Sequence, residues 1–450
     1  MNASKYNPIY HAIYVDENKC IGCTHCMKTC STAAIRIAKG KASINNGRCI
    51  DCGECMRSCP VNAIKIAQGG LDSIQKYKYR VVIIPAVLSG QFKLDITTDE
   101  IHQALLNIGF THVYEEELSA EFQIRAIRKF QNESEHKPVI SSFCPAIVRL
   151  IQVRFPTLTE NLVLVKSLID ITAMTILNKF EDSGIDATEV GIFYVTPCAA
   201  KIVAMISPVG DENSPITGFL NMDMMFDVIS KELQNIKSKA AVNDDRKVHL
   251  TKTEIKWSLT GGEIKHASGR KLSIDGIANV IDFLNKVDDE AIDDIDFLEL
   301  RACDQSCAGG ILCPGNRFLT VEKLMMRAKN ENINRRQLSE YNNFSYDDIK
   351  VPKVKPRRVF GLDEDVSEAL KKMEIVNELL KELPKIDCGS CGSPTCEAFA
   401  GDVAVGKSKI ENCVFIQAGK NIGNKETIER TWGNDKISPE LINKSNTNES

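Results

Sequence analysis

The chain has 450 residues, 43% of them hydrophobic, and a net charge of −4 at pH 7, a balance typical of a globular protein with roughly two to four domains. The slight acidity gives no electrostatic basis for binding nucleic acid. The longest apolar run, Val81–Leu88, is too short to span a membrane. The first residues lack the apolar core of a secretory signal, so we expect a cytoplasmic protein. Seventeen cysteines are many for such a protein, and without export metal binding explains them better than disulfides.

An internal repeat with a period of 29 residues, seen from Cys20 to Cys49, occupies the first seventy positions. Each copy contains C-x2-C-x2-C-x3-C and is too small to bury a core, so bound metal must hold it together. This spacing is typical of two-cluster ferredoxins, in which the fourth cysteine of each run ligates the other cluster. We therefore predict two [4Fe–4S] clusters in preference to paired zinc sites. Their ligands would be Cys20, Cys23, Cys26 and Cys59 for one, and Cys49, Cys52, Cys55 and Cys30 for the other.

Between Arg80 and Asn342, short apolar runs alternate with amphipathic helical stretches, which predicts a parallel α/β sheet structure. The predicted strands are Val81–Leu88, Pro138–Ser142, Val190–Val195 and Ile295–Leu300. After the first strand, Thr98 is a candidate N-cap for a helix that stops at Gly109. The last three strands lead into Cys144, Cys198 and Cys303. Because ligands bind beyond the carboxyl ends of parallel strands, we expect these cysteines to converge.

The C-terminal region begins with a proline-containing linker, Val351–Arg358, followed by a predicted helix, Asp363–Leu383, that stops at Pro384. A small cysteine module follows, and from about Asn424 the chain is polar and predicted to be mobile. The module contains Cys388, Cys391, Cys396 and Cys413. It resembles the single-cluster domain of corrinoid-protein and sensory iron–sulfur systems, with the pattern C-G-x-C-G-x-x-T-C. We predict a further [4Fe–4S] cluster here, with zinc as the alternative.

Three short central motifs occur in a characteristic order downstream of the repeat. They are Ser141-Ser-Phe-Cys144-Pro145-Ala, Thr196-Pro-Cys198-Ala-Ala-Lys201 and Ala302-Cys303-Asp-Gln-Ser-Cys307-Ala-Gly-Gly310. In this order the chain resembles the [FeFe] hydrogenase large subunit from Val15 to about Met326. The resemblance implies a fourth [4Fe–4S] cluster held by Cys144, Cys198, Cys303 and Cys307, with Cys307 also bridging to a diiron subcluster. It further implies that Lys201 hydrogen-bonds a cyanide ligand of the diiron unit, and that Pro85-Ala86 lines its pocket.

Four departures from the family pattern bear on function. Phe143 replaces the cysteine that relays protons in catalytic members, and a phenyl ring cannot carry a proton. Thr196 and Arg301 replace methionines, and Cys313 replaces a glutamine in the third motif. We interpret Cys313, the seventeenth cysteine, as a buried side chain rather than a redox thiol.

Three functional hypotheses follow. The stretch from Leu272, the Asn316-Arg-Phe sequence and the C-terminal cluster module are similar to the sensory branch of the family. The leading hypothesis is therefore a redox protein that senses dihydrogen or redox state with little turnover. The second is a catalytically active, ferredoxin-linked hydrogenase with another proton route. The third is an electron-transfer or assembly protein that never receives the diiron unit.

The predicted architecture has four parts: a ferredoxin-like two-cluster module (10–70), a twin-lobed parallel α/β H-cluster-type domain (78–345), a small helical [4Fe–4S] domain (360–420) and a polar tail (424–450). Expected partners are an electron donor or acceptor such as ferredoxin and a separate kinase or phosphatase. Neither nucleic acid nor a membrane is expected.

Overall fold

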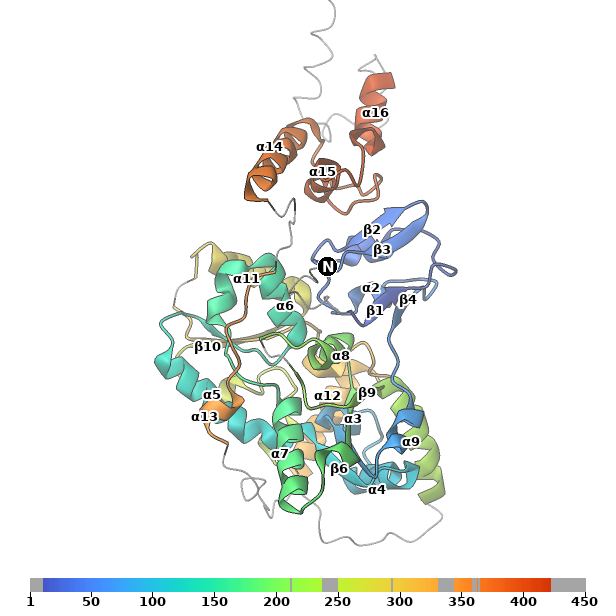
Figure 1. Ribbon diagram of the computed structural model, residues 1–450, viewed down its shortest axis with the longest axis vertical. Coiled ribbons are helices and arrows are strands. Elements are labelled where there is room, and N and C mark those ends of the chain that lie inside the picture. The colour runs from blue at the N-terminus through green and yellow to red at the C-terminus, as the bar shows by residue number, and fades with distance from the viewer. Residues whose placement is uncertain are drawn as a thin grey trace, which may run out of the picture. The chain divides into compact units, whose positions relative to one another are not determined.

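The computed structural model describes residues 11–210, 213–236, 250–292, 294–330, 344–357, 362 and 365–421, so the predicted polar tail lies outside the described residues (Figure 1). The contacts divide the chain into two compact units. The first comprises Met1–Ile13, Ile50–Gly53 and Ile66–Pro356, and the second Tyr14–Cys49, Glu54–Lys65 and Arg357–Ser450. Within the described ranges, no helix is long and apolar enough to cross a membrane.

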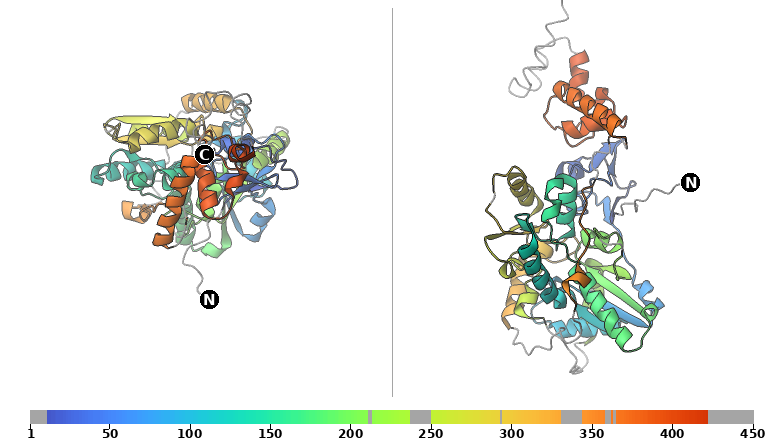
Figure 2. Two further views of the ribbon diagram at one scale, coloured as in Figure 1. Left: turned by 90° about the horizontal axis from the view of Figure 1, so that it is seen from above. Right: turned by 60° about the vertical axis from the view of Figure 1, so that its left-hand side comes forward.

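The larger sheet of the first unit has four parallel strands in the order β6-β5-β8-β9. They are β5 (Tyr79–Ile84), β6 (His112–Glu115), β8 (Val190–Thr196) and β9 (Gly218–Asn221). The right-hand view of Figure 2 shows its blue and green strands side by side. The predicted strand Val81–Leu88 is too long, because Pro85 cannot extend the hydrogen-bond ladder and instead precedes the short helix α3 (Ala86–Ser89).

The smaller sheet has three parallel strands in the order β10-β11-β7. They are β7 (Val139–Ile140), β10 (Lys271–Asp275) and β11 (Phe297–Arg301). Their apolar side chains pack in one core with α6 (Pro145–Arg154) and α11 (Ile277–Asp288). Two parallel sheets with helical crossovers confirm the predicted twin-lobed α/β domain.

Helices lie between the strands of both sheets and after the last strand. Those between strands include α4 (Thr98–Ile108), α5 (Ala120–Glu133), α7 (Leu168–Asp182), α8 (Ala199–Ile206), α9 (Met222–Ile236) and α10 (Lys252–Ile255), whereas α12 (Arg317–Asn330) and α13 (Tyr346–Ile349) follow β11. The N-cap of α4 is Thr97 rather than the predicted Thr98, because Thr97 and Glu100 form a reciprocal capping box. The helix ends at Gly109 as predicted.

The N-terminal repeat is visible as two matching sets of elements. Helices α1 (His25–Thr29) and α2 (Glu54–Arg57) start 29 positions apart, at His25 and Glu54. The first copy continues into the antiparallel hairpin of β2 (Ile35–Ala38) and β3 (Lys41–Ile44), and β1 (Ile13–Val15) pairs with β4 (Ile64–Ile66). The amides of Ala34 and Ala63 donate at 3.2 Å to Sγ of Cys30 and Cys59, respectively. The ferredoxin-like module is therefore confirmed.

The C-terminal region is a small helical module of α14 (Val366–Glu382), α15 (Cys396–Ala404) and α16 (Val414–Asn421). Helix α14 starts after its N-cap Asp365 and ends just before Leu383 and Pro384, close to the prediction. The core of this module contains the buried side chains of Leu383, Phe399 and Cys413. Such a core is small, and bound metal would add to its stability.

Candidate metal centres

The first cysteine set of the ferredoxin module crosses between the two copies of the repeat. Cys26 lies within electrostatic reach of Cys20 and Cys23 from its own copy, and of Cys59 from the other. Burial and these three neighbouring thiols raise the pKa of Cys26 to about 11. This is the crossed set of four that the spacing predicts, although ligation itself stays a prediction.

Cys52, a predicted ligand of the second ferredoxin cluster, belongs to the first unit, whereas Cys30, Cys49 and Cys55 belong to the second. The segment Ile50–Gly53 is anchored by the buried carboxylate of Asp51, which accepts hydrogen bonds from Ala12 N (3.1 Å) and Arg149 Nη1 (3.2 Å). Cys52 packs against the core around the smaller sheet and acts electrostatically on Cys303. This segment therefore brings a ferredoxin cysteine to the central cysteine set.

The four C-terminal cysteines line one pocket. Cys396 starts helix α15, and Cys413, which is buried, directly precedes α16. The pKa of Cys391 is raised by burial and by the neighbouring thiols of Cys388 and Cys413. Four thiols around one small cavity fit a tetrathiolate cluster.

The central cysteines come from the carboxyl ends of strands in both sheets. Cys144 and Cys198 follow β7 and β8 as the N-caps of α6 and α8, and Cys303 and Cys307 follow β11. Burial is the main cause of a raised pKa at Cys303, which also lies within electrostatic reach of the other three thiols. The third motif packs on the second, because a side chain at Gly310 would meet Pro197 O at 2.5 Å. The four thiols thus surround one site.

The chemistry of this central set fits a [4Fe–4S] cluster, since its donors are four sulfur atoms. Burial raises the pKa of Cys198 to about 11 and that of Cys307 to about 12, although Lys201 and Arg301 oppose the shift at Cys307. Iron loading would release these thiol protons. Thr196, in place of the family's methionine, closes the turn by accepting from Cys198 N at 3.3 Å and donating to Cys198 O at 2.9 Å.

Lys201 is buried and held by two groups that sequence reasoning missed. Its Nζ lies 2.5 Å from Glu116 Oε1 and 3.0 Å from the Tyr194 hydroxyl, and that hydroxyl donates to Glu116 Oε2 at 2.5 Å. Burial alone would lower the pKa of Lys201, but Glu116 and Cys307 raise it to about 12. The ammonium therefore stays charged beside Cys307.

Phe143 lies between two buried cations. Lys201 Nζ is 4.9 Å and Arg301 Cζ 3.9 Å from the centre of its ring. Arg301 is paired with two buried carboxylates: Nη2 lies 3.1 Å from Glu263 Oε2, and Nε lies 3.4 Å from Glu299 Oε1. The position next to Cys144 therefore holds an apolar ring without any titratable group.

Two buried donors around Phe143 lack hydrogen-bond acceptors. Arg301 Nη1 and Trp257 Nε1 are both inaccessible and unpaired, and Trp257 packs in the same cluster as Phe143 and Cys307. Such donors suit a bound group that accepts hydrogen bonds, and the cyanide and carbonyl ligands of a diiron unit have this property. The residues around Cys307 therefore fit the diiron group.

Another buried carboxylate, Glu117, follows Glu116 of the Lys201–Glu116–Tyr194 network. It accepts hydrogen bonds from Ala86 N at 2.8 Å and from Ser258 Oγ at 2.9 Å. Burial and the charge of Glu116 raise its pKa to about 8. The only sequence signal is the acidic run Glu115–Glu117 inside the predicted α/β region, and such a run looks solvent-exposed when taken alone.

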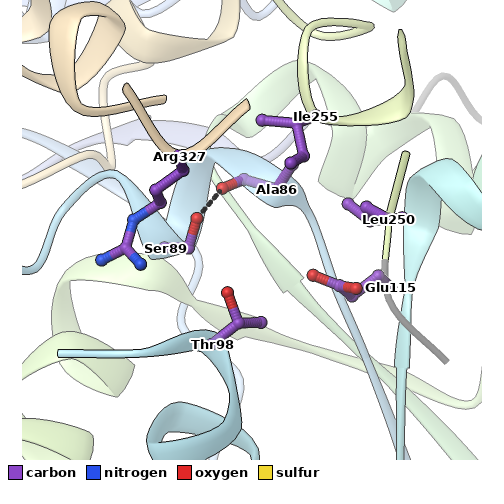
Figure 3. Close-up of a pocket in the computed structure, with 7 residues that line it drawn as sticks. All are labelled: Ala86, Ser89, Thr98, Glu115, Leu250, Ile255 and Arg327. Atoms are coloured by element: carbon purple, nitrogen blue, oxygen red, sulfur yellow. Dashed lines mark hydrogen bonds between the residues drawn. The ribbon is translucent and has the colours of Figure 1, made fainter. Parts of the chain in front are cut away.

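Cys313 is half-buried rather than buried as predicted. Its Sγ lies 3.4 Å from Cys307 O and 3.7 Å from Met222 Sδ. A separate small pocket is lined by Ala86, Ser89, Thr98, Glu115, Leu250, Ile255 and Arg327, none of which is a cysteine (Figure 3). We assign it no metal.

Comparisons with known proteins match segments in three of the four predicted parts of the chain. Residues 13–69 match the family model of a 4Fe-4S dicluster domain, residues 78–268 that of the C-terminal domain of the iron only hydrogenase large subunit, and residues 383–415 that of an Fe-S cluster. A stretch of 39 residues is 49% identical to the corrinoid/iron-sulfur protein large subunit of Moorella thermoacetica; it covers 9% of either protein's length.

Solved [FeFe]-hydrogenases are similar in structure. One, solved at a stage of H-cluster assembly, has a TM-score of 0.48 and 15% identity over 64% of this chain and 98% of its own. A variant from Chlamydomonas reinhardtii has a TM-score of 0.48 and 14% identity over the same shares. From the family matches, the chain carries a 4Fe-4S dicluster domain, then the C-terminal domain typical of the large subunit of iron-only hydrogenases, then an Fe-S cluster domain.

Proposed function

We propose that this protein is a sensory-type relative of the [FeFe] hydrogenases, which reports dihydrogen or redox state and turns over hydrogen slowly. The observation that carries the proposal is Phe143, buried between the charges of Lys201 and Arg301. A site that must deliver protons rapidly needs a titratable group within hydrogen-bond reach, and this side chain offers none.

The proposal includes four [4Fe–4S] clusters and a diiron subcluster bridged by Cys307. The four cysteine sets would hold the clusters, and Lys201, Arg301 Nη1 and Trp257 Nε1 would face the diiron ligands as donors. When bound, the diiron group would supply the centre at which dihydrogen is split or formed. The chain's own contribution is a buried environment for that group, in which Lys201 and Arg301 are each paired with carboxylates and an apolar ring occupies the proton-relay position.

The proposed partners are an electron donor or acceptor such as a ferredoxin, and a separate kinase or phosphatase that receives the signal. The ferredoxin-like module supports the first partner. The second rests on the resemblance of the C-terminal cluster module to sensory systems. We propose that helix α14 of this module transmits the redox state of the cluster held by Cys388, Cys391, Cys396 and Cys413.

A second candidate, an active hydrogenase with another proton route, is favoured by one observation. Glu117 is buried, has a pKa of about 8 and is hydrogen-bonded to Ser258, so it can hold or release a proton near neutral pH. In this alternative, protons would pass through carboxyl and hydroxyl groups instead of the position of Phe143.

Infrared spectroscopy after maturation with the hydrogenase assembly factors separates these functions. The sensory proposal expects carbonyl and cyanide bands with little hydrogen evolution. Bands accompanied by turnover equal to that of catalytic family members would favour the active enzyme. No bands, under conditions that mature a control hydrogenase, would favour an electron-transfer or assembly protein without the diiron unit.

A further inference from the structure

The C-terminal cluster module and the ferredoxin module of the second unit contact each other through the loops that carry their cysteines. The backbone of Ile37, in strand β2, donates a hydrogen bond to Gly392 O at 2.8 Å. Gly392 directly follows Cys391, so the cluster-binding loop continues the edge of the β2-β3 hairpin. This contact lies beside the ligands and not at a distant surface.

Only glycine fits at this junction. Gly392 has φ +86°, and a Cβ there would overlap Ile37 O. A Cβ on Gly389, next to Cys388, would lie 2.8 Å from Cε of Met27. Both motif glycines therefore allow the ferredoxin module to approach closely.

Charged side chains also stabilise the contact between the ferredoxin module and the C-terminal module. The guanidinium of Arg36 forms an ion pair with Asp402 of helix α15, and both side chains are largely buried. Asp402 also accepts from Ser393 Oγ at 2.9 Å, which ties the ion pair to the cluster loop. Arg48 lies within electrostatic reach of Asp402 and of Cys30. A partly buried, charge-assisted contact of this kind is stronger than an exposed ion pair.

The contact provides a short electron-transfer path between two of the predicted clusters. Met27 is fully buried and covalently follows Cys26, a predicted ligand of the first ferredoxin cluster. Its methyl group meets Gly389, which covalently follows Cys388 of the C-terminal set. The path from ligand to ligand therefore contains a single through-space step.

From this juxtaposition we infer that the C-terminal module exchanges electrons directly with the ferredoxin module through the Met27–Gly389 and Ile37–Gly392 contacts, and thereby serves as a terminal electron port. In each transfer one electron leaves one module, which is oxidised by one equivalent, and enters the other, which is reduced by one equivalent. No bond to the protein forms or breaks, and dithionite supplies the electrons in the test. The inference rests on the proposed cluster assignments but not on the diiron unit.

The test is electron paramagnetic resonance on the full chain, reconstituted anaerobically with iron and sulfide alone and reduced with dithionite. We expect magnetic coupling between the reduced C-terminal cluster and a reduced ferredoxin cluster. Arg36→Gln removes the charged contact without altering the C-terminal loop, and should lower the ratio of docked to undocked molecules about tenfold. Gly392→Ala, which places a methyl group against Ile37 O, should abolish the coupling.

Gly401→Ala is the matched control, because a Cβ at Gly401 meets nothing within 4 Å. It should retain the wild-type coupling and iron content. If Gly392→Ala loses iron, its lost coupling is uninformative, and the coupling measured in Arg36→Gln alone tests the inference. Absence of coupling in the wild type, or coupling unchanged in Arg36→Gln at equal iron content, would overturn the inference. Since infrared bands are not used here, failure of the diiron assignment would not affect this outcome.

Discussion

The guanidinium of Arg301 stacks on the ring of Phe143, with its central carbon 3.9 Å from the ring centre. A buried cation against an aromatic face gains about 2 kcal/mol or more when desolvated. Both residues are departures from the hydrogenase pattern, one from cysteine and one from methionine. Their contact shows that the two departures form one structural unit beside Cys144.

Substitution of Phe143 tests whether this unit limits hydrogen turnover. Phe143→Cys should raise hydrogen turnover of the matured protein by roughly 100-fold, because it restores a group that relays protons. The new thiol would lie between Lys201 and Arg301, and these cations would favour its thiolate. Phe143→Leu is the control and should leave turnover low. Equal turnover of the two variants would contradict the explanation.

Arg301 should be important for stability. Arg301→Met leaves the buried carboxylates of Glu263 and Glu299 without their cation, which should cost about 3–5 kcal/mol. Anaerobic urea unfolding measures the loss. Arg317→Met, which breaks a partly exposed ion pair with Asp304, should cost about 0–1 kcal/mol. A neutral effect at Arg301 would show that it does not balance the two carboxylates.

The carboxyl group of Glu263 should make stability depend on pH. Burial raises its pKa to about 7, with Arg301 opposing and Glu299 reinforcing the shift. The folded state therefore holds a proton that the unfolded state releases at lower pH, so stability falls as pH rises from about 4.5 through 7. Glu263→Gln should flatten this fall, by about 3 kcal/mol at most. The check is the unfolding midpoint of both proteins across that pH range; parallel curves would refute the assignment.

Iron content tests the four cysteine sets together. Full anaerobic reconstitution should give about sixteen iron atoms per chain, and about two more if the diiron unit loads. Cys313→Ser should leave the number unchanged, since this cysteine lies outside the four sets. A wild-type value of about twelve or fewer would mean that one set is wrong.

The C-terminal cluster should be dispensable for folding and needed for signalling. Cys396→Ser should remove about four iron atoms while leaving the central site intact. Pull-down of a co-purified partner from oxidised and reduced samples should then show binding that no longer depends on redox state. If the wild-type protein and the variant both bind the partner equally in either state, the cluster only stabilises its small domain.

Much of the architecture could be predicted because its signals are local. The ferredoxin spacing is the same in both copies, and the electrostatic interaction of Cys26 with Cys59 follows the crossed pattern. Strand ends before Cys144, Cys198 and Cys303 were visible as apolar runs, since parallel strands are buried on both faces. Errors arose where one residue decides a boundary, as at Thr97, whose capping box excludes Thr98, and at Pro85, which ends β5.

The chemistry around the central cysteines depended on the tertiary structure. Glu116 and Lys201 are 85 positions apart, and Arg301 is paired with Glu263 from a different segment. No local pattern records such pairs, because a charged residue looks solvent-exposed until the fold buries it beside its partner. The cysteine spacing by itself therefore determined the cluster sets, whereas only the packing of the two sheets decided which charges surround Cys307.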